Sequence, residues 1–205
     1  MYTLVTLPGT CSTGIHVLLN ILDIKAEVVH RDKVPNYQQI VPTNQVPALI
    51  NGDLVLTEGS AIVLYLLDKH QITFTSEQEK NTFNQWLMFN YATLHPAYSK
   101  LFTTASVMTD SEEKTVYLRQ LAENVARLWQ IIDNRLAQQQ YLTGNSVTVI
   151  DYLLAIYANW GNYFPELTIP LGDNVKNLVA DLTQHKVFVD AFEQEGASFN
   201  LPKGA

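Results

Sequence analysis

The spacing of hydrophobic positions changes several times within the first 30 residues. Apolar and polar residues alternate in "YTLVT" (2–6) and again in "AEVVH" (26–30), which is the spacing of a half-buried strand. Between these segments, apolar residues from Ile15 to Leu22 recur at helical intervals. The sequence therefore predicts a strand, a helix and a second strand, in this order.

A hairpin and a helix are predicted after a short irregular segment. The apolar segments "VPALI" (46–50) and "LVLT" (54–57) flank the turn "NGD", and Asn-Gly between two apolar segments is a hairpin signal. The next segment, "EGSAIVLYLLDKH" (58–70), has one apolar helical stripe and ends in a lysine and a histidine, which suit a helix C-terminus. This part of the chain has the predicted order βαβ–ββα.

Helical spacing dominates the rest of the chain, where strand signals largely vanish. Apolar residues form one stripe from Phe83 to Leu101 and another from Val116 to Leu136, with the polar segment "TDSEE" between them. Pro96 predicts a kink in the first stripe, because proline removes a helical N–H and clashes with the previous turn. We therefore expect an α/β N-terminal domain and an all-α C-terminal domain, joined by "QITFTS" (71–76).

A capping signal opens another helix in "VTVIDYLLAIYANW" (147–160). Thr148 stands three residues before Asp151, at the head of an apolar run. A threonine hydroxyl can accept from backbone N–H groups of the first turn, while the carboxylate reaches back to the cap residue. We assign Asp151 a structural role and not a catalytic one.

Composition and charge exclude several classes of protein. The net charge is −7, and the 13 lysines and arginines are scattered, which argues against a nucleic-acid partner. No apolar run approaches the roughly 20 residues that cross a bilayer, and no export signal is visible, so we expect no membrane partner and a cytoplasmic location. The single cysteine cannot form an internal disulfide, which fits a reducing compartment.

That cysteine, Cys11 in "PGTCSTGIH", stands where the first strand gives way to the first helix. Backbone N–H groups at a helix start and the helix dipole favour a thiolate, and lowering the pKa by ~2 units needs ~2.7 kcal/mol. We therefore expect an anionic sulfur at this site. The alternative is that a lone cysteine is simply a small buried hydrophobic residue.

Four segments together resemble the cytosolic glutathione transferases, and most of all their bacterial beta class. They are "CSTGIH", "NQVPALI", "LTEGSAIVLYL" and "VTVIDYLLAIYANW", and they occur in the family's order. The resemblance implies a thioredoxin-like domain at residues 1–70 and a helical domain at 77–205 that forms the co-substrate side of a cleft. It also implies a homodimer with glutathione bound in that cleft and no metal.

The resemblance also implies a set of residues that bind glutathione. A cis peptide bond between Val46 and Pro47 leaves the backbone of Val46 free to pair with the cysteinyl part of the tripeptide. The N–H groups that open the helix after Glu58 receive the γ-glutamyl carboxylate, and the carboxylate of Glu58 pairs with the ligand's ammonium. The full predicted set is Lys33, Gln45, Val46, Pro47, Glu58, Gly59 and Ser60.

Catalytic roles fall on Cys11, Ser12 and His95 by the same resemblance. Ser12 helps to orient the sulfur, and His95 faces the cysteine across the cleft and tunes the sulfur or binds the ligand. Ser12 can equally be a helix-start residue, and a histidine in an apolar stripe is more often core. An apolar wall for the co-substrate is predicted from Tyr91, Tyr98, Phe102, Trp160 and Tyr163.

The function that follows is conjugation of reduced glutathione to small hydrophobic electrophiles. One alternative is thiol–disulfide exchange or peroxide reduction with Cys11 as nucleophile. Because Gly14 takes the place of a second thiol, such a disulfide would need an external partner such as glutathione. Another alternative is a non-catalytic member of the family that binds ligands or a protein.

Overall fold

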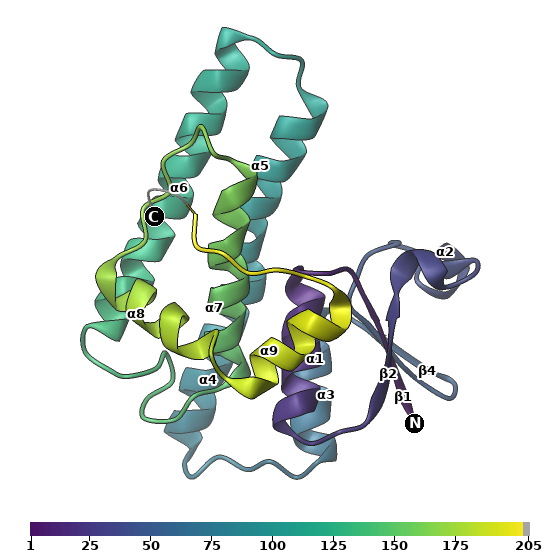
Figure 1. Cartoon of the computed structure of the whole chain (residues 1–205). Helices are drawn as coiled ribbons and strands as arrows, with labels where there is room; N and C mark the ends of the chain where they lie inside the picture. Colours follow the sequence, from purple (N-terminus) through teal and green to yellow (C-terminus); the bar gives the residue numbers. More distant parts are fainter. Residues whose placement is uncertain (203–205) are drawn as a thin grey trace. The chain divides into compact units, whose positions relative to one another are not determined.

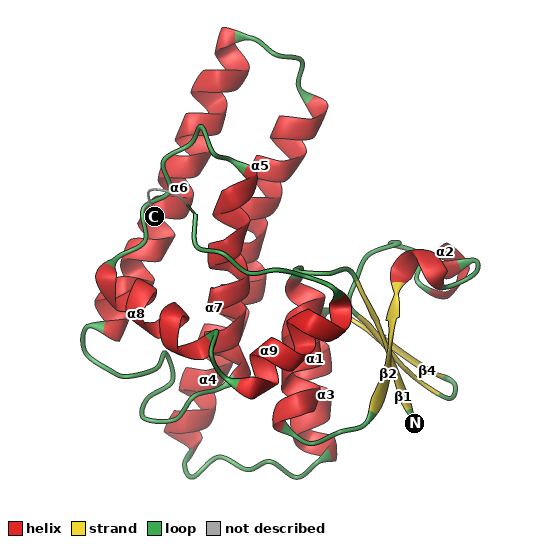
Figure 2. Ribbon diagram, in the orientation of Figure 1, coloured by secondary structure: helices red, strands yellow, loops and turns green. Residues whose placement is uncertain are grey.

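A computed structural model of the chain describes residues 1–202, and its elements divide into two compact units. Unit 1 comprises Met1–Lys80 together with Leu182–Phe199, and unit 2 comprises Asn81–Asp181 with residues 200–202. All the strands of the described residues belong to unit 1, as the colouring of Figure 2 makes plain. The expected change from α/β to all-α organisation is confirmed.

The sheet of unit 1 has four strands in the order β2-β1-β3-β4. β1 pairs in parallel with β2, whereas β1–β3 and β3–β4 are antiparallel. The parallel pair is joined through α1, and the hairpin β3–β4 leads into α3, so the predicted order βαβ–ββα is confirmed. The elements are β1 (Tyr2–Thr6), α1 (Cys11–Ile21), β2 (Ala26–His30), η1 (Arg31–Lys33), α2 (Tyr37–Ile40), β3 (Ala48–Asn51), β4 (Leu54–Thr57) and α3 (Gly59–Lys69).

Both faces of this sheet are covered, because side chains alternate along each strand. Val5 packs on one face with Tyr37 and Val41 around the short helix α2. Leu4 points to the opposite face, where α1 and α3 lie and where Ile15 and Ile62 are completely buried (Figure 1). The sheet itself therefore lies between two layers of packed side chains, and α1 belongs to one of them.

Helix α9 (Lys186–Glu195) packs on α1 and belongs to unit 1, although it lies more than 100 residues further along the chain. Its residues Phe188, Ala191 and Phe192 are buried. The sequence analysis placed this segment with the helical domain of 77–205, and the packing of unit 1 corrects that boundary for residues 182–199. The sequence predicts a helical second part of the chain but cannot tell which partner covers the apolar face of α9.

Unit 2 is built from helices. An antiparallel pair, α5 and α6, forms its longest part (Figure 1). Trp129 of α6 donates from Nε1 to the hydroxyl of Tyr98 on α5 at 2.9 Å. The elements are α4 (Glu77–Phe89), η2 (Asn90–Leu94), α5 (His95–Val107), α6 (Glu112–Leu136), α7 (Val149–Asn159), η3 (Trp160–Tyr163) and α8 (Asp173–Leu182).

The irregularity expected near Pro96 occurs as a π-helical turn, η2, between α4 and α5. Pro96 lies at the start of α5, where the missing N–H costs least. Asn90 at the start of η2 is completely buried, and its Nδ2 donates to the carbonyl of Trp86 at 3.2 Å. The apolar stripe from Phe83 to Leu101 therefore runs over two helices, α4 and α5, with a π-helical turn between them.

The predicted capping box at the head of α7 is confirmed. The hydroxyl of Thr148 accepts from the N–H of Ile150, and Oδ2 of Asp151 accepts from the N–H of Thr148 at 2.8 Å. The other carboxylate oxygen accepts from the N–H of Leu142 at 2.9 Å. Asp151 is completely buried and ties a loop to the helix start, which is a structural role. No helix within residues 1–202 has the length and apolar character needed to span a membrane.

Candidate active site

Cys11 is the first residue of α1, as the sequence predicts. Thr10 is the N-cap, and its hydroxyl oxygen accepts from the N–H of Ser12 at 3.3 Å. The hydroxyl of Thr10 in turn donates to the carbonyl of Leu7 at 2.8 Å. These hydrogen bonds thus fix the loop between β1 and α1, and the sulfur of Cys11 lies at the first residue of the helix.

The ionisation expected for Cys11 is wrong for the protein without a ligand. Burial raises the pKa of the thiol to about 12, and the carboxylate of Glu58 also raises it. The N–H groups of Cys11 and Ser12 act in the expected direction and lower the pKa, but they do not offset burial. Because only 7% of the residue is exposed, the thiol carries its proton at neutral pH.

The cis peptide bond between Val46 and Pro47 is present, as predicted. It lies just before β3, beside the sulfur: the thiol of Cys11 donates to the carbonyl oxygen of Val46, with 3.8 Å between Sγ and O. The bent backbone at Val46 and the start of α1 therefore meet at one point of unit 1.

The side chain of Ser12 faces the strand end and not the sulfur. Its Oγ accepts from the N–H of Leu7 at 3.1 Å and lies 2.8 Å from the hydroxyl of Thr10. The residue is completely buried. The hydroxyl thus supports the β1–α1 loop, and the backbone N–H is the part of Ser12 that lies next to Cys11.

The start of α3 has an unusual backbone. Glu58 has φ +65°, a value that side chains with a Cβ rarely adopt, and its carboxylate makes no capping hydrogen bond. Gly59 is buried, Ser60 is half-buried and Glu58 is exposed. Strain of this kind is kept where the surroundings require one conformation, and here it occurs at a helix start without a side-chain cap.

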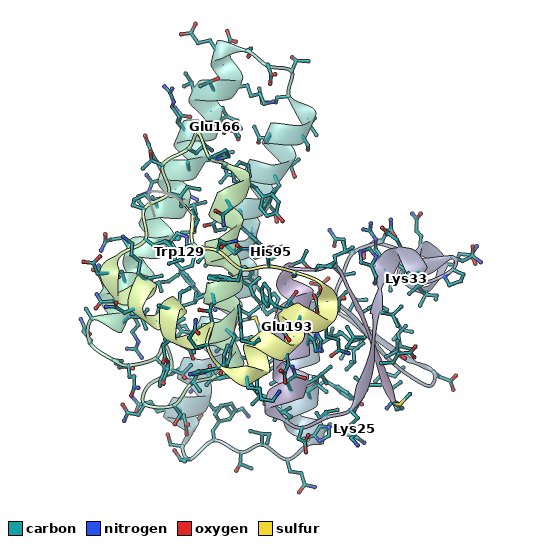
Figure 3. All side chains as sticks on the ribbon, viewed as in Figure 1. Lys25, Lys33, His95, Trp129, Glu166 and Glu193 are labelled. Atoms are coloured by element: carbon teal, nitrogen blue, oxygen red, sulfur yellow. The ribbon has the colours of Figure 1, made fainter. Side chains whose placement is uncertain are left out.

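Arg31 is a second candidate, besides Lys33, for the cation that binds the ligand, and it has more contacts than Lys33. Lys33, labelled in Figure 3, is exposed in η1. Arg31 of the same turn donates from Nη1 to the carbonyl of Asn44 at 3.4 Å, next to Gln45, and lines a cavity of about 390 Å³ that Lys33 does not line. Gln45 is itself fixed, because its carbonyl accepts from the hydroxyl of Tyr37 at 2.7 Å.

In unit 2, His95, labelled in Figure 3, is the first residue of α5 and contacts other aromatic rings. Its ring makes edge contacts with Tyr157 and Trp160, with centroids 5.8 and 5.2 Å apart, and Nδ1 lies 3.3 Å from the hydroxyl of Ser99. Burial lowers the pKa of His95, so the imidazole is neutral at pH 7.

The residues predicted for an apolar wall separate into two groups. Phe102 and Tyr163 pack together with centroids 5.5 Å apart, and Tyr163 is 63% exposed. Tyr98 is completely buried, so its assignment to an accessible wall is wrong: its hydroxyl accepts from Trp129 in the core. Trp160 is buried between these groups, and Tyr91 is half-buried in η2.

Sequence reasoning missed three residues of unit 1 that lie in the first helix, contact it or contact the segment before β3. They are Arg31, His16 and Glu195. His16 and Glu195 are hydrogen-bonded between α1 and α9, with 2.9 Å between Nδ1 and Oε1. No local pattern links residues 179 positions apart, so only tertiary packing brings them together.

The family of the chain follows from comparison with known proteins. Residues 1–68 match the glutathione S-transferase N-terminal domain, and residues 94–183 match the glutathione S-transferase C-terminal domain. The chain belongs to the glutathione S-transferase family and is a glutathione transferase enzyme.

Individual relatives agree with this assignment. Glutathione S-transferase GST-4.5 of Xanthomonas campestris is 25% identical over 167 residues, which cover 78% of this chain and 82% of the relative. A solved glutathione S-transferase from Xylella fastidiosa has a TM-score of 0.86 at 23% identity and covers 97% of this chain and 100% of its own. A sphingomonad glutathione S-transferase, solved in complex with glutathione, has a TM-score of 0.80 at 23% identity, with 96% and 100% covered.

Proposed function

We propose that this glutathione transferase conjugates reduced glutathione to small hydrophobic electrophiles. The observation that carries the proposal is the meeting of the Cys11 thiol with the carbonyl of Val46 at a cis peptide bond, 3.8 Å apart. There a helix start can stabilise an anionic sulfur while an extended backbone can pair with a small peptide.

Glutathione binds mostly to backbone groups in this proposal. The N–H and C=O of Val46 pair with the cysteinyl residue, and Pro47 keeps the backbone bent. The N–H groups of Gly59 and Ser60 at the start of α3 receive the γ-glutamyl carboxylate, because N–H groups at a helix N-terminus are unpaired and the helix dipole is positive there. The exposed carboxylate of Glu58 pairs with the ligand's ammonium group.

The glutathione sulfur, and not Cys11, is the nucleophile. Since burial keeps Cys11 protonated, its S–H can donate a hydrogen bond to a thiolate of bound glutathione, together with the backbone N–H groups of Cys11 and Ser12. These donors stabilise the charge that the reaction consumes. Thiol–disulfide exchange through Cys11 would instead require the protein's own thiolate, which burial disfavours.

His95 and its aromatic neighbours serve the second substrate. We assign the neutral imidazole a hydrogen bond to the ligand, and the surfaces of Tyr91, Phe102 and Tyr163 an apolar contact with the electrophile, with Trp160 and Tyr98 supporting them from the core. Burying an aromatic or alkyl electrophile against such rings is favourable by roughly 25 cal/mol per Å². The proposal includes a homodimer and a cytoplasmic location.

The decisive experiment replaces Cys11 by alanine and measures two activities. Conjugation of glutathione to 1-chloro-2,4-dinitrobenzene should persist within about tenfold, because only one of several donors to the glutathione sulfur is lost. Glutathione-dependent disulfide exchange should be negligible in both proteins. If exchange is substantial in the parent and vanishes with Cys11→Ala, the redox function is the correct one. If the parent neither binds immobilised glutathione nor shows either activity, a non-catalytic role replaces the proposal.

The cation for the glycyl carboxylate is tested by a matched pair of variants. Arg31 holds the carbonyl of Asn44 and lines a cavity, whereas Lys33 is exposed, so Arg31→Gln should raise the KM for glutathione about tenfold and Lys33→Gln less than twofold. The kcat should change little in both. The reverse order of effects would return the role to Lys33, as the sequence alone predicts.

A further inference from the structure

The carboxylate of Glu195 is buried at the end of α9, inside unit 1. Its side chain is completely buried, and it accepts from the hydroxyl of Thr13 at 2.8 Å and from Nδ1 of His16 at 2.9 Å. Both donors lie in the first two turns of α1. Nε2 of His16 is also engaged, 3.1 Å from Oε1 of Gln194. The last turn of α9 is therefore attached to the first turns of the helix that begins with Cys11.

The contact with Thr13 continues into the loop before Cys11. The same hydroxyl that donates to Glu195 accepts from the N–H of Gly9 at 3.0 Å. Gly9 has φ +70°, a conformation in which glycine is favoured, so the loop turns sharply at this residue. A continuous path of hydrogen bonds thus runs from the backbone of Gly9 through Thr13 to Glu195.

Docking of α9 on its own would not need a charged group at this point. Phe188, Ala191 and Phe192 of α9 already bury apolar surface. A carboxylate loses its hydration when it is buried, and a buried ionic group is often no more stabilising than an apolar residue of the same size. The carboxylate instead orients its neighbours. It fixes which rotamer Thr13 adopts and, through the hydroxyl of Thr13, where the N–H of Gly9 is held.

We infer that Glu195 and Thr13 are positioning residues that hold the segment Gly9–Cys11, so that the C-terminal helix of this chain sets the geometry and the accessibility of the thiol. The inference deepens the proposed function, on which it rests for the identity of the ligand. Its structural part, the restraint of Cys11, does not depend on glutathione and is tested without it.

The first experiment measures alkylation of Cys11 by iodoacetamide at pH 8 in the ligand-free protein. Thr13→Val removes the hydroxyl that links Gly9 to α9, while Thr13→Ser keeps it. Because a buried thiol reacts only when its segment opens, Thr13→Val should speed alkylation about tenfold and Thr13→Ser should restore the parental rate within about twofold. Equal rates for the valine and serine variants would overturn the inference.

The second comparison uses two glutamates of α9. Glu195→Gln removes the buried charge, whereas Glu193→Gln makes the same chemical change at an exposed position, labelled in Figure 3. Glu195→Gln should speed alkylation severalfold, and Glu193→Gln should leave it unchanged. If Thr13→Val does not fold, this pair decides the question by itself.

A third variant separates positioning from simple loosening of the helices. Nδ2 of Asn20 donates to the carbonyl of Val187 at 3.0 Å and so also joins α1 to α9, but it does not reach the loop. Asn20→Ala should leave the alkylation rate within about twofold of the parent, even if it lowers the melting temperature as much as Thr13→Val does. An acceleration as large as that of Thr13→Val would mean that α9 acts only by its packing, and the inference would fail.

Kinetics with glutathione complete the test. Thr13→Val should lower the kcat for conjugation about tenfold and change the KM for glutathione less than threefold, because the segment orients the sulfur while Val46 and the start of α3 hold the rest of the tripeptide. A parent that fails to bind glutathione would refute the proposed function, whereas the alkylation rates would still decide on the restraint. A parent that binds glutathione, with a valine variant of unchanged kcat, would refute the positioning role alone.

Discussion

At the scale of single residues, Cys11 illustrates how position and environment compete. A helix start provides N–H groups and a positive dipole end, and both lower the pKa of a thiol. Burial acts in the opposite direction and dominates, so the pKa is raised to about 12. An anionic sulfur of a bound ligand would therefore meet a neutral thiol that can donate a hydrogen bond to it.

The ionisation of Cys11 predicts an unusual pH profile for its alkylation. In the native ligand-free protein, the rate with iodoacetamide should still rise between pH 8 and 10, because the thiolate fraction increases until the pH approaches the raised pKa of about 12. In the protein unfolded by guanidinium, the same cysteine should level off near an ordinary pKa of about 8.5. A native profile that levels off below pH 9 would contradict the raised pKa.

The same pKa shift has a consequence for stability, with a definite sign. The folded protein binds the thiol proton more tightly than the unfolded chain does, so this group stabilises the fold fully below about pH 8.5. The contribution is lost as the pH rises toward about 12. Cys11→Ser should lessen the decrease of unfolding free energy between pH 8.5 and 10, which denaturant titrations at several pH values would measure. An unchanged decrease would argue against the shift.

At the scale of elements, side chains cap the starts of several helices. Thr10 caps α1, and the box of Thr148 and Asp151 caps α7, each through hydroxyl or carboxylate oxygens that accept from otherwise unpaired N–H groups. The start of α3 differs, because Glu58 leaves it without a side-chain cap. Side chains of the protein occupy the first-turn N–H groups of α1 and α7, whereas the proposed function assigns those at the start of α3 to the ligand.

Removal of the carboxylate at α7 should destabilise the protein strongly. In Asp151→Ala, the N–H groups of Leu142 and Thr148 lose their acceptor, and each buried unpaired N–H costs about 1–3 kcal/mol, so unfolding free energy should fall by roughly 2–6 kcal/mol. Asp173→Ala, which changes an exposed aspartate in the first turn of α8, is the control and should leave the denaturation midpoint unchanged. A small effect of Asp151→Ala would mean that another group replaces the acceptor.

At the scale of the whole molecule, the chain enters each unit twice. Unit 1 is interrupted after Lys80 and resumes at Leu182, so unit 2 is the connection that brings α9 to α1. If unit 2 unfolds, that connection becomes a flexible loop of about 100 residues, and its closure costs roughly 4 kcal/mol. This is a large part of the 5–15 kcal/mol that stabilises a typical domain.

The interrupted connectivity predicts a single unfolding transition. The three tryptophans, Trp86, Trp129 and Trp160, all lie in unit 2, whereas Cys11 lies in unit 1. Tryptophan fluorescence and Cys11 accessibility to a thiol reagent therefore report on different units, and their midpoints in urea should coincide. Two separated midpoints would show that unit 1 keeps its fold without a folded unit 2.

Much of this architecture is encoded locally. Alternation and helical spacing predict the order βαβ–ββα, the helical second part and the irregularity before Pro96, because each element must present an apolar face with its own period. The capping box at Thr148 and Asp151 is local too, since its members are three residues apart. The cis bond at Val46–Pro47 and the set of residues around it came from the resemblance, because no single pattern in the chain specifies them.

The tertiary structure alone decided three features. It returned α9 to the first unit and joined Glu195 to Thr13 and His16, which are about 180 positions apart in the sequence. It placed Tyr98 in the core, although its spacing also fits an exposed wall. It reversed the expected ionisation of Cys11, because a thiol's pKa depends on how much water remains around it, and packing of distant segments determines that burial.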